Sequence, residues 1–221
     1  MIKAVLFDLD GTIANTLQDL ADASNFALAS FGFPTYETDR YRYFVGRGIP
    51  NLIKAIVPAE HGDEKTLTAV KAKFFEYYDL HYADNTCVYE GVPQLFTTLK
   101  SMGIKFAVVT NKAHSAAVEV VKRLYGDTIN VVVGQTDDVP VKPAPQMPSN
   151  AAKQLGVDTT ECLFVGDSGV DCQTGVNCGA VSVGVLWGFR ERDELLENGA
   201  KYINDKPYSI VEIIKELNNV K

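Results

Sequence analysis

The sequence predicts an α/β fold, a doubly wound, Rossmann-like parallel sheet with a helical domain inserted after its first strand. From about residue 90 onward, short apolar runs alternate with amphipathic segments of helical length. Such alternation is typical of parallel strands joined by right-handed helical crossovers. Residues 15–85 break the pattern, because they show helical periodicity and contain no run that resembles a buried strand.

The first strand is an unbroken apolar run that begins at Ala4 and ends in two carboxylates, Asp8 and Asp10, followed by Gly11. A short apolar run closed by a turn signal predicts a strand buried on both faces of a parallel sheet. Side chains alternate along a strand, so Asp8 and Asp10 are expected on the same side of its end. Open parallel sheets bind ligands just beyond the carboxyl ends of their strands. We therefore expect both carboxylates to belong to a functional site.

The remaining strands and helices are predicted from the same signals, short apolar runs for strands and helical periodicity for helices. Buried strands are expected at residues 105–111, 129–133, 162–167 and 180–186, with a last short strand near 202–204. Helices are expected at 93–102 and 113–124, the first with Pro93 in its opening turn and Gly103 as its stop. Inside the insertion, helical periods cover 17–31, 48–57 and 63–82. We expect an α/β core of residues 1–14 and 86–221, and a helical cap domain of residues 15–85.

Composition narrows the class of partner. The 221 residues carry a net charge of −7 and include no long run of lysine or arginine, which argues against a nucleic-acid partner, because that binding depends on clustered cations. No apolar stretch approaches the roughly 18–20 residues of a membrane span. Because residues 1–3 lead directly into the predicted first strand, we expect no signal peptide. We expect a cytoplasmic protein with four reduced cysteines; its oligomeric state stays open.

Polar residues follow four of the predicted strands. They are Asp8 and Asp10 after the first, Thr110 and Asn111 with Lys112 after the second, Lys142 after the third, and Asp167 after the fourth, with Asp171 one helical turn later. Each pair or single residue alone would be a weak signal. Because a doubly wound sheet gathers its strand ends at one edge, we expect these side chains to converge on one crevice.

This arrangement resembles the haloacid dehalogenase (HAD) superfamily over essentially the whole chain. The family's D-x-D-G-[TV] signature is matched from Asp8 to Thr12, its strand-ending threonine by Thr110, its lysine ahead of a helix by Lys142, and its acidic G-D-x-x-x-D by Gly166, Asp167 and Asp171. The helical insertion and several local segments are similar to the phosphoglycolate phosphatase branch. Asn15 departs from the aspartate of many relatives, and Met147 replaces a usual proline; neither is a catalytic position.

The resemblance implies a phosphatase that forms an aspartyl-phosphate. Asp8 is then the nucleophile, and Asp10 protonates the leaving group and later accepts a proton from water. Mg²⁺ is held by Asp8, the Asp10 backbone carbonyl and Asp167, while Asp171 orients Lys142 or a metal-bound water. Lys142, Thr110 and backbone N–H groups near Gly11 and Asn111 contact the phosphoryl oxygens.

Electrostatics favours the cations in this scheme. From the reference carboxyl pKa near 4, Asp8 is expected to be ionised at neutral pH without help from a base. A carboxylate about 4 Å from a phosphate dianion is repelled by roughly 8 kcal/mol at an effective dielectric of about 20. Lys142 and an oxygen-ligated Mg²⁺ would offset that repulsion. Structural alternatives remain for three of these residues. Lys142 could be a solvated lysine of a loop, Thr110 could only end its strand, and Asp171 could only stabilise the start of its helix.

The substrate is expected to be a small phosphorylated metabolite such as phosphoglycolate. Arg47, in the cap, could hold a substrate carboxylate with its two-pronged guanidinium, or it could be solvated or paired with acids of the cap. Inorganic pyrophosphatase, sugar phosphatase and phosphosugar mutase activities are alternatives on the same scaffold. A ligand-sensing protein without catalysis is the alternative of a different class. A dehalogenase or phosphonate hydrolase is disfavoured, because Asp10 supplies an acid that those reactions do not need.

Overall fold

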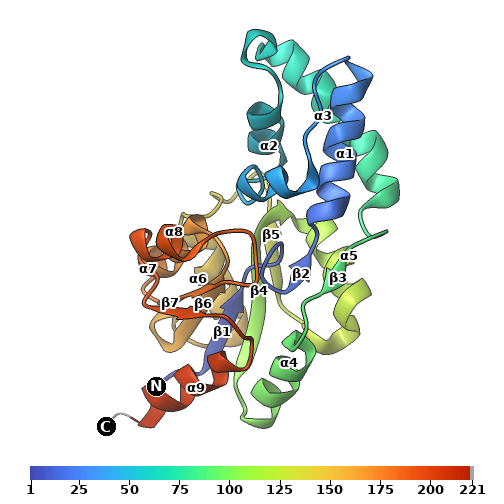
Figure 1. Cartoon of the computed structure of the whole chain (residues 1–221). Helices are drawn as coiled ribbons and strands as arrows, with labels where there is room; N and C mark the ends of the chain where they lie inside the picture. The colour runs from blue at the N-terminus through green and yellow to red at the C-terminus, as the bar shows by residue number, and fades with distance from the viewer. Residues whose placement is uncertain (220–221) are drawn as a thin grey trace. The chain divides into compact units, whose positions relative to one another are not determined.

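The computed structural model describes residues 1–219 and confirms the predicted α/β class (Figure 1). Six parallel strands form one sheet in the order β5-β4-β1-β6-β7-β8. Their bounds are Ala4–Phe7 for β1, Lys105–Ala113 for β4, Val132–Gln135 for β5, Cys162–Gly166 for β6, Val181–Val185 for β7 and Tyr202–Asn204 for β8. β1 lies between β4 and β6, so the strand that ends in Asp8 is central, and all four of its residues are buried.

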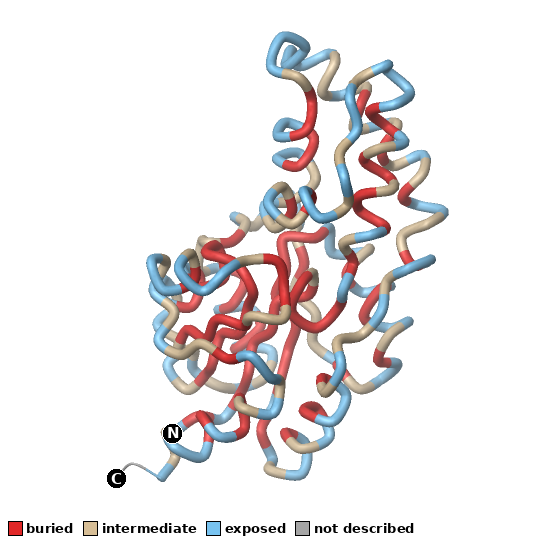
Figure 2. Tube along the Cα trace, in the orientation of Figure 1, coloured by how far each residue is buried: buried red, intermediate tan, exposed pale blue. Residues whose placement is uncertain are grey.

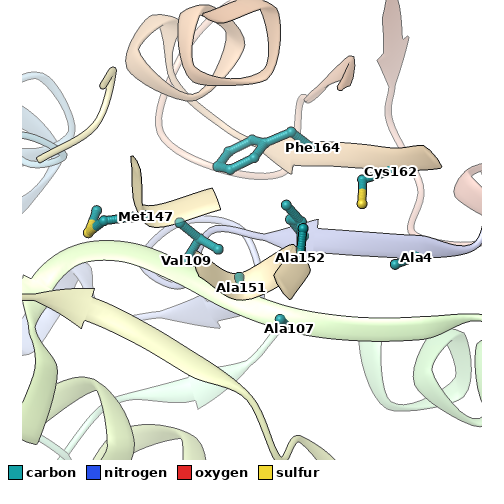
Figure 3. Close-up of a cluster of buried hydrophobic side chains, with 9 residues drawn as sticks. Ala4, Ala107, Val109, Met147, Ala151, Ala152, Cys162 and Phe164 are labelled. Carbon is teal, nitrogen blue, oxygen red and sulfur yellow. The ribbon is translucent and has the colours of Figure 1, made fainter. Parts of the chain in front are cut away.

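Helices cover both faces of this sheet. They are α4 (Val92–Ser101), α5 (His114–Tyr125), α6 (Gln146–Leu155), α7 (Gly169–Cys178), α8 (Arg192–Glu197) and α9 (Ser209–Asn219). On one face, α6 places Ala151 and Ala152 against Ala4, Ala107 and other buried residues of β1, β4 and β6 (Figure 3). Small side chains at these positions let the α6 backbone approach the sheet closely.

Alternate residues of the strands serve the opposite face. Phe7 of β1 meets Phe96 of α4 edge-on, with ring centroids 5.4 Å apart. Phe96 also stacks on Phe106 at 4.9 Å and meets Tyr125 of α5 edge-on at 5.1 Å. The two-residue period of β1 is thus used on both sides of the sheet, as expected for a strand without a polar break. Figure 2 shows the buried residues gathered along these central strands.

The predicted strand at 129–133 is wrong in its bounds. The strand β5 begins at Val132 and extends to Gln135. A short 3₁₀ turn over Gly126–Thr128 follows α5, and Ile129 is buried without being part of the strand. An apolar side chain in a connecting loop therefore mimicked the start of a buried strand.

Contacts divide the described chain into two compact units, Asn15–Cys87 and the rest. The first unit is helical: α1 (Leu17–Ser30) packs against α3 (Glu64–His81), and α3 also contacts α2 (Ile49–Ile56). β2 (Ala14–Asn15) pairs with β3 (Cys87–Val88) where the chain passes between the units. Within residues 1–219, no helix combines the length and apolar character that crossing a membrane requires.

Candidate active site

The loop after β1 is held by its own backbone. The N–H groups of Thr12, Ile13 and Ala14 all donate to the Leu9 carbonyl at 2.9–3.2 Å, which folds the chain back directly after the two carboxylates. Gly11 lies within this turn at φ +87°, and a Cβ there would overlap the Asp167 carboxylate. Glycine is required at this position for both reasons.

Asp8 and Lys142 meet at the centre of the site. The Lys142 Nζ lies 2.7 Å from Asp8 Oδ1 and 2.7 Å from Asp171 Oδ1. All three residues are buried, with Lys142 only 3% exposed. A lysine so placed between two carboxylates is not a solvated loop residue. One buried cation is therefore shared by two acids that are 163 residues apart in the chain.

Asn111 fixes the backbone that carries this lysine. Its side-chain Oδ1 accepts from the Lys142 N–H at 2.8 Å, and its Nδ2 donates to the Lys142 carbonyl at 3.2 Å. The amide thus pairs with both backbone groups of Lys142, much as a neighbouring strand would. Asn111 was predicted as a substrate-binding position; its side chain makes this structural contact, and its role toward substrate stays a prediction.

Asp167 and Asp171 are oriented by different donors. Asp167 Oδ1 accepts from the Thr12 hydroxyl at 3.1 Å, and its Oδ2 accepts from the Phe189 N–H at 2.8 Å. Asp171 Oδ2 accepts from the Ser168 N–H and hydroxyl at 3.1 and 2.6 Å, which forms the capping box of α7. Asp171 is therefore both a helix-start residue and a partner of Lys142.

Asp10 pairs with Lys112, a contact that the sequence did not predict. The Lys112 Nζ lies 3.1 and 3.3 Å from the two Asp10 carboxylate oxygens. Thr110 is buried, and its hydroxyl accepts from the Lys112 N–H at 3.2 Å. The available signal was the position of Lys112, directly after Asn111 near the end of a central strand, but position alone gave it no partner.

Burial shifts the charges of this cluster. Burial, reinforced by Asp171, raises the pKa of Asp8 to about 7 although Lys142 opposes the shift. Burial, Asp171 and Asp8 together raise the pKa of Asp167. For Lys142, burial acts to lower the pKa, but Asp171 and Asp8 outweigh it and the pKa is raised. Asp8 is therefore only partly ionised near neutral pH unless another cation approaches, unlike the expectation from its reference pKa.

The donor set suits a hard divalent cation. Oxygens of Asp8, Asp167 and Asp171 lie within 4.8 Å of one another, and all three residues are buried. Lys142 compensates part of their charge, which leaves an excess of buried carboxylate. Carboxylate oxygens are the ligands that Mg²⁺ prefers, and a bound cation would stabilise the ionised forms. The residues present therefore fit a magnesium site.

Arg47 belongs to the other unit, Asn15–Cys87. It lies in the loop before α2, between Gly46 and Gly48, which both adopt positive φ. Its side chain is exposed, and its backbone carbonyl accepts from the Asn51 amide at 2.7 Å. Among residues 1–219, the Arg47 guanidinium forms no ion pair, whereas Arg42 pairs with Asp39. Its role toward substrate stays a prediction.

Comparison with known proteins identifies the family of this chain. A family model described as haloacid dehalogenase-like hydrolase matches residues 5–185, a range that includes Asp8, Lys142 and Asp167. The chain belongs to the haloacid dehalogenase-like hydrolases. The resemblance expected from the sequence motifs is thereby confirmed.

Several known proteins are similar to this HAD-like hydrolase over most of its length. N-acetylmuramic acid 6-phosphate phosphatase of Pseudomonas aeruginosa is 30% identical over 218 residues, 96% of this chain and 95% of the relative. Phosphoglycolate phosphatase of Chromobacterium violaceum is 32% identical over 199 residues, 88% and 89% of the two chains. A crystal structure from Lactobacillus delbrueckii subsp. bulgaricus, provisionally named phosphoglycolate phosphatase, matches with a TM-score of 0.91 at 30% identity, covering 96% and 98%.

The shifted pKa of Asp8 predicts a pH-dependent stability. In the folded protein Asp8 has a pKa of about 7, whereas in the unfolded chain its pKa returns to the ordinary aspartate value of 3.8. The resulting stabilisation is complete below that lower pKa and is lost as pH rises through the upper one. Asp8→Asn has no carboxyl group to titrate at this position, so only the wild type loses this stabilisation as pH rises. In chelator, the Tm of the variant relative to wild type should therefore rise by several degrees between about pH 4 and 7. Scanning calorimetry across that range measures the difference, and a constant difference would contradict the shift.

Proposed function

We propose that this HAD-like hydrolase is a Mg²⁺-dependent phosphatase that hydrolyses a small phosphate monoester through an aspartyl-phosphate on Asp8. The observation that carries the proposal is the contact of Asp8 with Lys142 at 2.7 Å, beside two further buried carboxylates, at the end of the central strand. A ligand-sensing protein has no need for a nucleophile held against a cation in this way. The similar proteins with phosphatase names support the same reaction.

In the first step, a carboxylate oxygen of Asp8 attacks phosphorus, and the ester P–O bond breaks. Lys142 holds the Asp8 oxygen and supplies positive charge as the two anions approach. Asp10 donates its proton to the departing alkoxide, so the alcohol leaves neutral. Lys112, 3.1 Å from Asp10, holds that carboxyl group in place.

In the second step, water attacks the phosphorus of the aspartyl-phosphate and Asp10 accepts the water's proton. Phosphate leaves and Asp8 is regenerated as a carboxylate, so both catalytic groups return to their starting forms. Thr110 and the backbone N–H groups near Gly11 and Asn111 are proposed donors to the phosphoryl oxygens. Gly11 suits this role because it has no side chain to block the approach.

The metal would be held by Asp8 and Asp167, with the Asp10 backbone carbonyl as a further ligand. Both oxygens of Asp171 have protein partners, Lys142 on one side and Ser168 on the other. Asp171 is therefore assigned the role of orienting Lys142. When bound, Mg²⁺ supplies positive charge that offsets the repulsion between Asp8 and the phosphate group.

The helical unit Asn15–Cys87 is proposed as a cap that selects the substrate. The substrates in the names of the two relatives, phosphoglycolate and N-acetylmuramic acid 6-phosphate, each carry a carboxylate besides the phosphate ester. Arg47 is exposed and has no acidic partner among the described residues, and its guanidinium matches a carboxylate. We assign it to that substrate group.

Arg47→Ala should therefore weaken binding of a carboxylate-bearing ester selectively. We expect KM for phosphoglycolate to rise by about tenfold or more, the loss of a charged hydrogen-bonded pair, while kcat/KM for para-nitrophenyl phosphate stays within about twofold. Arg42→Ala, which removes an arginine already paired with Asp39, is the matched control. An unchanged KM for phosphoglycolate would remove Arg47 from the site.

A panel of phosphate esters tests the reaction itself. Phosphoglycolate, sugar 6-phosphates, para-nitrophenyl phosphate and pyrophosphate are each incubated with Mg²⁺ or with chelator, and released phosphate is measured. We expect ester hydrolysis that chelator abolishes and added Mg²⁺ restores. Preference for pyrophosphate, or isomerisation of a sugar phosphate without phosphate release, would indicate one of the scaffold alternatives. A wild-type protein inert on every compound would favour the sensor.

A further inference from the structure

The segment after β7 encloses the carboxylate of Asp167. The Phe189 N–H donates to Asp167 Oδ2 at 2.8 Å. A Cβ on Gly188 would overlap both Asp167 and the Gly11 carbonyl oxygen, so the chain passes here at the closest distance that glycine allows. From the other side, Asp167 Oδ1 accepts from Thr12 at 3.1 Å. Two loops that are far apart in the sequence therefore hold one carboxylate.

Trp187 joins these two loops. Its indole Nε1–H donates to the Thr12 carbonyl at 2.8 Å, across 175 residues of sequence. Thr12 thus accepts from Trp187 through its backbone and donates to Asp167 through its side chain. The indole thus contacts the residue whose hydroxyl donates to one oxygen of Asp167.

We propose that Trp187 is a positioning residue for Asp167, acting through Thr12 and so through the metal site. The proposal rests on Asp167 as a metal ligand of the proposed function. Partners that orient a metal ligand typically contribute tenfold to a hundredfold to metal affinity, because a ligand free to rotate must be ordered on binding. Trp187 is the only tryptophan of the chain.

The surroundings of the ring make a clean test possible. Trp187 lines a cavity of about 500 Å³ together with Tyr89, Pro207 and Tyr208. A residue beside a cavity can be made smaller with less loss of packing than one in a filled core. Trp187→Phe keeps an aromatic ring and removes the N–H donor. Tyr208→Phe is the matched control, because Tyr208 lines the same cavity and its substitution leaves the hydrogen bond from Trp187 to Thr12 in place.

The first measurement is Mg²⁺ affinity without substrate, by isothermal titration calorimetry. We expect Trp187→Phe to weaken Mg²⁺ binding by about tenfold or more, and Thr12→Val, which removes the hydroxyl donor to Asp167, to do the same. The double variant should be little weaker than either single variant, because both substitutions interrupt one chain of contacts. Tyr208→Phe should bind as wild type. Wild-type affinity in Trp187→Phe, or independent additive losses, would overturn the proposal.

The second measurement does not depend on metal. In chelator, the Phe189 amide, which donates to Asp167, should exchange its hydrogen about tenfold faster in Trp187→Phe and in Thr12→Val than in wild type or Tyr208→Phe. An unchanged exchange rate at Phe189 would also overturn the positioning role. A wild-type protein that binds no Mg²⁺ would instead contradict the metal of the proposed function, while the exchange result still decides the role of Trp187.

Discussion

Asp8→Asn is expected to lower kcat for every ester that the wild type hydrolyses by about 10⁴-fold or more, because the amide cannot attack phosphorus. The substitution is nearly isosteric, and Lys142 keeps its partner Asp171 at 2.7 Å, so the fold should be retained. Mass spectrometry of the wild type quenched during turnover should show one added phosphoryl group on the peptide containing Asp8. The same peptide of the variant should remain unmodified.

The control for this variant is Asp127→Asn, an exposed acid of the same unit, which should keep wild-type activity. Retention of more than about a hundredth of wild-type kcat in Asp8→Asn would exclude Asp8 as the nucleophile. Loss of activity together with loss of the folded circular dichroism spectrum would leave the chemistry undecided by kinetics alone. The phosphopeptide measurement on wild type settles that case.

Lys142→Met is expected to damage both activity and stability. Asp8 and Asp171 would lose their shared cation in a buried site, and breaking a buried ion pair on one side costs about 3–5 kcal/mol. Asp8, whose pKa burial already raises to about 7, can relieve part of this cost by taking up a proton at low pH, so the destabilisation should be larger at pH 8 than at pH 5. Urea unfolding at both pH values measures it, and kcat should fall by about 10³-fold.

Lys153→Met is the matched control for that variant, since Lys153 is exposed on α6 of the same unit. It should unfold at the wild-type urea concentration at both pH values. If Lys142→Met destabilised the protein by the same amount relative to wild type at pH 5 and pH 8, the buried carboxylates would not be the groups that Lys142 compensates. If its kcat were unchanged, the lysine would have only a structural role.

Much of the fold was predictable because its signals are local. The apolar run of β1, the two-residue period of the strands and the helical period of α1 and α4 each depend on neighbouring residues, and the observed bounds of these elements lie within a residue or two of the predicted ones. The order of polar residues after the strands was also readable, and parallel strands gather their ends at one edge whatever the connecting loops contain. The bounds of β5 were wrong because buried loop residues and buried strand residues have the same composition.

Local patterns were enough to predict that Lys142, Asp167 and Asp171 lie near Asp8, because strand ends, glycines and carboxylates are recognised from neighbouring residues. How the residues of the site pair depends on contacts between distant segments. Lys112 contacts Asp10, Asn111 contacts the Lys142 backbone, and Trp187 reaches Thr12, each across more than 25 residues of sequence. The raised pKa of Asp8 also depends on the tertiary structure, because burial and the neighbouring Asp171 cause it. Partner choice and desolvation depend on which segments the sheet order brings together, and no local period carries that information.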